Sequence, residues 1–202
     1  MSSTTTTSDA LSTNFFASAE ISSQNTTRIS ESLSSKTQRK AVGGQHWMIQ
    51  LQSKPLNREE LGILYSFLVK QQGSFSDFTI VPPIYGSTAS TNASGTPTIT
   101  ATFAAGVSRV SSQSGSGSLK AGDYIKFSNH DKVYMLVQDI NQDSSTEDFL
   151  HISPPLTTAI TNSTTVVYNN VPFKVYLTSD KTVFKTNTDG TSTISITVRE
   201  DI

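Results

Sequence analysis

The chain has 202 residues, of which about three in ten are serine or threonine, and it carries a formal net charge of −1. This length allows one domain, or one domain that carries a smaller second one. The near-zero charge argues against a nucleic-acid partner, which would require a basic face. The absence of cysteine excludes disulfides, thiolate catalysis and cysteine-ligated zinc. No apolar run is long enough to span a bilayer, so we expect no membrane partner.

Residues 1–36 are rich in serine and threonine and contain only scattered apolar side chains, among them Phe15, Phe16 and Ile21. A segment with so few apolar side chains cannot fold alone. We therefore predict an extended N-terminal arm that orders against its own domain or against a neighbouring subunit. A disordered tail is the alternative.

From His46 onward the pattern is that of a folded domain. Residues 46–52 alternate as a strand does, and the run KPLNREELGILYSFLVKQQG predicts a helix over residues 57–72. Asn57 and Glu60 have the spacing of a capping box. Apolar side chains then recur at helical spacing: Leu61, Leu64, Tyr65 and Leu68. A stripe of this kind is expected to cover a sheet.

Residues 86–168 differ in character, because short β-like runs alternate with glycine, serine, asparagine and aspartate turns. Regular short strands without a helix predict a small β-barrel or sandwich. At its centre, the stretch from Ser116 to Ile140 predicts strands joined by tight turns at Gly122–Asp123 and at residues 129–131.

Residues 169–202 predict further strands, of which ISITVRE alternates most cleanly. We expect these strands to complete the sheet that the helix covers. The predicted fold is therefore mainly β, of α+β type. A β-sandwich domain of residues 37–85 and 169–202, flanked by one helix, would carry an inserted β-barrel or sandwich domain of residues 86–168.

No motif in the chain predicts catalysis or metal binding, so we expect no enzyme and no cofactor. Three histidines are isolated from one another in the sequence: His46, His130 and His151. None has the spacing of a metal ligand on a helix. The many serines include none in the G-x-S-x-G turn of a nucleophile.

The sequence leaves two other functions to consider, an adhesin and a hydrolase. Tyr124 and Tyr134 could form an aromatic platform of a receptor- or carbohydrate-binding adhesin, although such side chains more often belong to a β-core. A hydrolase of cell-wall material would need a paired acid and base, for example Asp123 with Asp139 or Glu147. No spacing in the sequence brings such a pair together.

Three stretches of the chain together resemble a known family: QHWMIQLQSKPLNREELGILYSFLVKQQGSFSDFTIVPPIYG, SLKAGDYIKFSNHDKVYMLVQD and NNVPFKVYLTSD. They are similar to tail-tip and baseplate proteins of tailed bacteriophages, namely distal tail proteins and their adaptor-ring relatives. The resemblance covers residues 37–202 and is most specific in KAGDYIKFSNHDKVYMLV.

The resemblance implies a tail-tube-like domain that assembles into a ring, with the inserted β-domain facing outward. It implies a structural virion protein that is assembled in the cytoplasm of the bacterial host and joins the tail tube to baseplate or fibre proteins. The expected partners are these tail proteins and copies of the chain itself, in a hexameric or trimeric ring. Such a ring would satisfy exposed strand edges without open-ended aggregation. The candidate intersubunit contacts are Phe15, Phe16, Ile21, Ile194, Ile196 and Val198.

Overall fold

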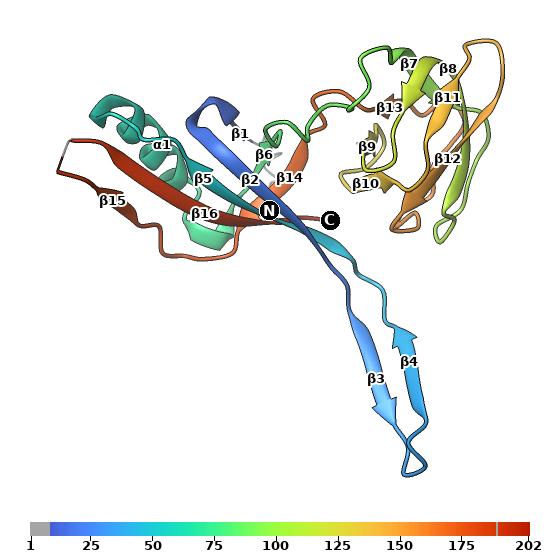
Figure 1. Cartoon of the computed structure of the whole chain (residues 1–202), viewed down its shortest axis with the longest axis horizontal. Helices are drawn as coiled ribbons and strands as arrows, with labels where there is room; N and C mark the ends of the chain where they lie inside the picture. The colour runs from blue at the N-terminus through green and yellow to red at the C-terminus, as the bar shows by residue number, and fades with distance from the viewer. Residues whose placement is uncertain (1–8, 189) are drawn as a thin grey trace, which may run out of the picture.

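The structure is a computed structural model that describes residues 9–188 and 190–202. The described residues form two seven-stranded sheets and a separate two-stranded hairpin (Figure 1). Each large sheet has its own hydrophobic core. We call them the first sheet and the second sheet, and we call residues 25–45 the projecting hairpin.

The strands of the first sheet are β1 (Asp9–Leu11), β2 (Phe16–Gln24), β5 (His46–Ser53), β6 (Asp77–Ile80), β14 (Phe173–Leu177), β15 (Phe184–Thr186) and β16 (Ser192–Glu200). Their order is β1-β6-β14-β16-β5-β2, with β15 paired to one end of β16. The pair β1–β6 is parallel and the other pairs are antiparallel. The helix α1 (Arg58–Lys70) and two short 3-10 turns, η1 (Thr13–Phe15) and η2 (Gly73–Phe75), accompany this sheet.

The strands of the second sheet are β7 (Ser94–Ile99), β8 (Arg109–Leu119), β9 (Tyr124–Phe127), β10 (Val133–Leu136), β11 (Ile140–Gln142), β12 (Asp148–Ser153) and β13 (Val166–Val167). Their order is β11-β8-β12-β10-β9-β13, with β7 paired to β8. All of these strands fall between β6 and β14 in the chain. The projecting hairpin contains β3 (Thr27–Glu31) and β4 (Thr37–Ala41).

The mainly β fold with one α-helix among the described residues confirms the predicted fold class. The two strands that alternation predicted most clearly, β5 and β16, are neighbours in the first sheet. Trp47, Ile49 and Leu51 of β5 share the buried face, as their spacing predicted. The strands after residue 169 therefore complete the sheet that contains β5.

The helix α1 forms through the local signals that its sequence contains. The Asn57 side chain accepts the backbone N–H of Glu60 at 2.9 Å, and the Glu60 carboxylate accepts that of Asn57 at 3.2 Å. This capping box satisfies two donors that a helix start leaves free. Leu64 and Leu68 are buried in the core of the first sheet. The helix ends at Lys70, two residues before the predicted end.

The described chain before residue 36 orders against its own domain, one of the two predicted possibilities, but residues 9–24 do so as strands of the sheet and not as a separate arm. Residues 1–8 of that arm lie outside the described residues. β1 pairs with β6 and β2 pairs with β5, so residues 9–24 belong to the first sheet. The sequence pattern hid β2 because its inward side chains, Phe16, Ala19 and Ile21, are few and irregularly spaced, while its main chain finds partners along β5. The chain leaves the sheet only at Asn25.

Candidate functional site

The hairpin formed by β9 and β10 connects the second sheet to the first. Its strands pair antiparallel on either side of the predicted turn at residues 129–131, with Tyr134 opposite Ile125. The Tyr124 ring packs edge-on against Trp47, with 5.1 Å between ring centroids. The indole N–H of Trp47 donates to the Val133 carbonyl at 2.8 Å. We call this contact between the sheets the junction.

A buried ion pair between Lys132 and Glu200 lies at the centre of the junction. The two side chains are 1% and 0% exposed. The Lys132 ammonium also donates to the side chain and the backbone carbonyl of Gln45, at 2.7 and 3.0 Å. The Glu200 carboxylate accepts the backbone N–H groups of Trp47 and Val133, at 3.1 and 2.8 Å. The pair therefore fastens the ends of three strands, β5, β10 and β16.

Burial dominates the electrostatics of this pair. Desolvation lowers the pKa of the Lys132 amine, against the favourable charge of Glu200. It raises the pKa of the Glu200 carboxyl, against the pull of Lys132 and of the two N–H groups. A buried pair of this kind holds only while its hydrogen bonds are complete. The arrangement suits a rigid connection between the sheets.

The three carboxylates considered for a hydrolase have separate structural partners. Asp123 is buried and accepts two backbone N–H groups and the Thr88 hydroxyl, which fixes the turn before β9. Asp139 forms an exposed ion pair with Lys120 at 2.9 Å. Glu147 accepts the hydroxyl of Thr100 at 2.5 Å. Each carboxylate stabilises a turn or a strand end.

Tyr124 and Tyr134 do not form the aromatic platform of the alternative adhesin, and they lie in the β-core that we considered more common for such side chains. Tyr124 is 8% exposed and Tyr134 is 0% exposed, so neither ring offers a face to a ligand. The Tyr134 hydroxyl accepts the backbone N–H of Thr157 at 3.1 Å and lies 2.8 Å from Nε2 of His130. Alternation in the sequence could not separate these core rings from exposed ones, because both strand faces carry aromatic side chains.

The residues predicted to contact other subunits divide into two groups. Four of them are buried in the core of the first sheet: Phe16, Ile194, Ile196 and Val198. Their side chains are not available to a partner in this conformation, because they are packed inside this core. Phe15 at the end of η1 and Ile21 in β2 are partly exposed, and their predicted role in contacts between subunits stays a prediction.

The histidines stay apart in the structure. His46 is buried beside Gln24 Oε1 at 3.0 Å, and His130 contacts Tyr134 at the far end of the β9–β10 hairpin. Over residues 9–188 and 190–202, no group of three His, Asp or Glu side chains could hold a metal ion. In the same part of the chain, no helix has the length and apolar character that a membrane crossing needs.

The projecting hairpin extends away from both sheets (Figure 1). Its strands pair from Thr27 opposite Ala41 to Glu31 opposite Thr37. Every side chain from residue 25 to residue 40 is exposed, and Leu33 at the tip is fully exposed. Four basic residues and one acidic residue lie on it: Arg28, Lys36, Arg39, Lys40 and Glu31. Its net charge is thus +3, which leaves −4 on the rest of a chain whose total is −1.

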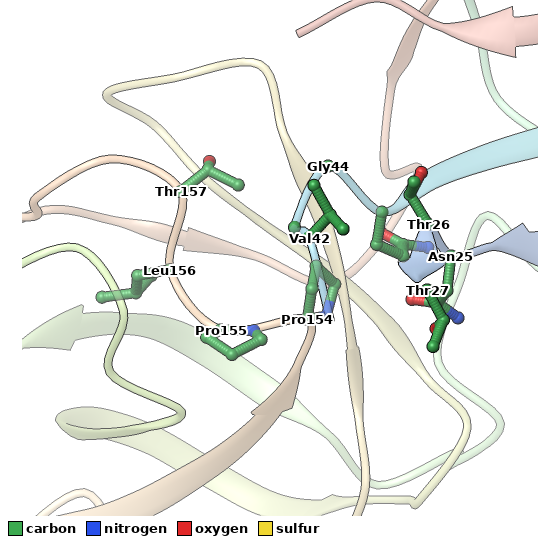
Figure 2. Close-up of a pocket in the computed structure, with 11 residues that line it drawn as sticks. Asn25, Thr26, Thr27, Val42, Gly44, Pro154, Pro155, Leu156 and Thr157 are labelled. Carbon is green, nitrogen blue, oxygen red and sulfur yellow. The ribbon is translucent and has the colours of Figure 1, made fainter. Parts of the chain in front are cut away.

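A pocket of about 680 Å³ lies at the root of this hairpin (Figure 2). One wall is residues 25–27 and 42–45, and the other is residues 154–157, which follow β12. Gly43 and Gly44 in the first wall have φ angles of 87° and 78°. Other residue types rarely adopt this backbone, so the two glycines suit the place where the hairpin departs from the sheet. Apolar groups of Val42, Pro154, Pro155 and Leu156 line the pocket.

In the described part of the chain, the outer edge of β2 is free. This strand is the outer one of the first sheet next to β5, and within the described residues no strand pairs with its other side. It is nine residues long, has no proline and carries one charged side chain, Glu20. An exposed edge of this length presents a row of unpaired backbone donors and acceptors.

Comparison with known proteins adds one finding. Residues 84–171, which contain β7 to β13, match the family model of the B domain of the distal tail protein pb9. No curated protein matches the chain. The resemblance to distal tail proteins of tailed bacteriophages is therefore confirmed over the second sheet. The match supports a structural role in a phage tail, as a component of the virion, and suggests that the chain is not an enzyme.

Proposed function

We propose that this chain, which resembles the distal tail proteins of tailed bacteriophages, forms a closed ring at the tail tip or baseplate. Copies of the chain, six or three of them, assemble in the cytoplasm of the host bacterium. The ring joins the tail tube to baseplate or fibre proteins. Residues 86–168 form an inserted domain that faces outward toward these neighbours, carried by a domain built on the first sheet.

The free edge of β2 carries this proposal. Proteins usually protect a long edge strand with charges, proline or a covering segment. β2 has little such protection, and Phe15 and Ile21 beside it are only partly buried. A neighbouring copy that adds a strand here would pair the free main-chain groups and cover these apolar side chains. Closed symmetry would then leave no edge open to further growth.

The junction supports the connecting role. A ring that holds several partners in register needs domains whose relative orientation is fixed. The buried Lys132–Glu200 pair and the Trp47–Val133 hydrogen bond fasten the second sheet to the first at two points. Inter-domain contacts in general are polar and permit movement, so this buried connection favours a stiff adaptor.

A substitution at Ala17 tests the edge directly. Ala17 is exposed and lies at the irregularity where the β2–β5 register shifts, so it has no residue opposite it in β5. Ala17→Lys places a charge at this exposed position of the edge strand, a feature by which proteins disfavour pairing with a further strand. We expect light scattering to give a closed oligomer for the wild-type chain and a monomer for the lysine variant, with the same Tm.

Ala17→Val is the matched control, because it enlarges the same side chain without a charge and favours a strand. It should assemble as the wild-type chain does. An oligomer that survives Ala17→Lys would place the contact elsewhere. A wild-type chain that stays monomeric at high concentration would count against the ring itself.

A further inference from the structure

We propose that the tip of the projecting hairpin of one copy binds in the pocket at the hairpin root of the next copy. This inference rests on the proposed ring and specifies one of its contacts. The partner is a second copy of this chain, and Leu33 is the apolar side chain that enters the pocket. The contact joins two different surfaces, so it repeats from copy to copy around a ring.

The tip is preorganised for such a contact. The backbone N–H of Ser35 donates to the carbonyl of Ser32 at 2.9 Å, and that of Ser32 donates to the carbonyl of Lys36 at 3.0 Å. These bonds close a defined turn that holds Leu33 outward. A two-stranded hairpin is only marginally stable by itself in water. A fully exposed leucine on a long isolated hairpin therefore favours a docked state.

The pocket offers a complementary surface. It is open to solvent and has apolar groups from both walls, with hydroxyls of threonine at its rim. Its volume of about 680 Å³ accommodates several side chains of a turn. One wall is the root of the hairpin, which leaves the first sheet, and the other is the segment that follows β12 of the second sheet (Figure 2). Burial of Leu33 against Val42, Pro154 and Pro155 would remove apolar surface of both copies from water.

Charge favours binding of the hairpin to the body of another copy. The hairpin carries +3 and the remainder of the chain −4, so two hairpins repel each other while a hairpin and a body attract. Among the described residues, those that line the pocket include no charged side chain that would repel the basic hairpin.

The length of the hairpin favours binding of its tip to the pocket of a neighbouring copy over binding to the pocket at its own root. The chain runs about ten residues from root to tip, which at about 3.3 Å a residue is roughly 30 Å. A paired hairpin cannot fold its tip back onto its own root. A reach of roughly 30 Å is about the diameter of a small domain, so the hairpin is long enough to reach a neighbouring copy.

Cysteine cross-linking tests the contact, because the chain has no native cysteine. The double variant Leu33→Cys with Thr157→Cys, treated with a short bismaleimide, should give a ladder of linked copies that ends at the copy number of the ring. The matched control is Leu33→Cys with Ser145→Cys, since Ser145 is exposed on the turn between β11 and β12. The control should give no ladder.

A second variant measures the apolar contribution. Leu33→Asp should raise the concentration at which the oligomer dissociates by about tenfold or more, since a charge replaces a buried leucine. Ser34→Asp places the same charge beside it and should have a much smaller effect. Both residues are exposed in the single chain, so neither change should alter its Tm.

The outcomes separate this inference from the proposed function. A closed oligomer in light scattering with no cross-linked ladder would overturn the hairpin contact and leave the ring. A monomer with no ladder would overturn both. Binding of labelled duplex DNA that is lost on Arg39→Glu would assign the hairpin to a nucleic-acid partner and would also overturn the inference.

Discussion

Lys132 and Glu200 are 68 residues apart in the sequence and buried together at the junction. Lys132→Met would leave the Glu200 carboxylate buried without its partner. We expect a loss of about 3–5 kcal/mol in the free energy of unfolding, because an uncompensated buried charge is costly. Equilibrium urea unfolding measures this loss.

Lys120→Met is the matched control. It breaks an ion pair whose atoms are 2.9 Å apart but whose side chains are 45% and 59% exposed. Exposed pairs contribute about 0–1 kcal/mol, so the expected loss is small. The double variant Lys132→Met with Glu200→Gln should recover part of the first loss, since the amide oxygen still accepts an N–H. Equal losses for the two lysines would show that burial is not what makes the junction stable.

Asp131 is expected to make the stability of the fold decrease at acid pH. Its hydrogen bond to the Lys126 ammonium, at 2.8 Å, lowers the pKa of this carboxyl below its ordinary value of 3.8. The folded state therefore holds the charged form more firmly than the unfolded state does. The contribution is complete above the ordinary pKa and is lost as the pH falls through the lowered one.

Asp131→Asn removes this contribution at every pH. As the pH falls from about 5 to about 2, the Tm of the wild-type chain should decrease by more than the Tm of the variant does. The other carboxyls with lowered pKa values are present in both proteins, so the difference isolates Asp131. Parallel curves over this range would contradict the assignment.

At the scale of elements, the projecting hairpin is expected to serve assembly and not folding. Its side chains from residue 25 to residue 40 are all exposed, so it buries little in the single chain. The backbone N–H of Val42 donates to the carbonyl of Thr26 at 3.0 Å, which shows that the two ends of the hairpin are adjacent. Replacement of residues 27–41 by an Asn-Gly turn should therefore leave the Tm of the monomer within a few degrees of the wild type.

The same deletion should weaken or abolish the oligomer. Differential scanning calorimetry checks the first result, and light scattering checks the second. A deleted chain that no longer unfolds cooperatively would show that the hairpin is part of the folding unit. This would contradict the exposure of its side chains.

At the scale of the whole molecule, the junction should make the two sheets unfold together. Trp47 is the only tryptophan, and its indole lies at the junction against Tyr124 and the Val133 carbonyl. Its fluorescence therefore reports on contact between the sheets, while circular dichroism reports on all the strands. We expect both signals to give the same urea midpoint, the test of a two-state transition. A fluorescence change at lower urea would mean that the sheets separate first.

Local signals in the sequence were sufficient for several elements. The capping box at Asn57 and the apolar stripe that includes Leu64 and Leu68 predicted α1. Alternation predicted β5 and β16, and turn residues predicted the β9–β10 hairpin. These predictions succeeded because the determining residues lie within a few positions of one another. Much of the mainly β architecture followed from them.

The candidate surfaces were less accessible to sequence reasoning. Tyr124 and Tyr134 fit an exposed platform and a core equally well, and only the position of the first sheet and of Thr157 shows that they are buried. The exposure of Leu33 at the hairpin tip could not be predicted either, because in the sequence it is one of several scattered apolar residues in a polar segment. What each side chain faces depends on segments far away in the chain.

The sequence by itself determined the class of the protein: mainly β, without cysteine chemistry, and similar to phage tail proteins. The tertiary structure alone decided that residues 9–24 are strands, that residues 25–45 project, and that Lys132 meets Glu200. The physical reason is the range of the interactions. Strand propensity and helix capping act between near neighbours, whereas edge pairing, burial and desolvation depend on which distant segments meet.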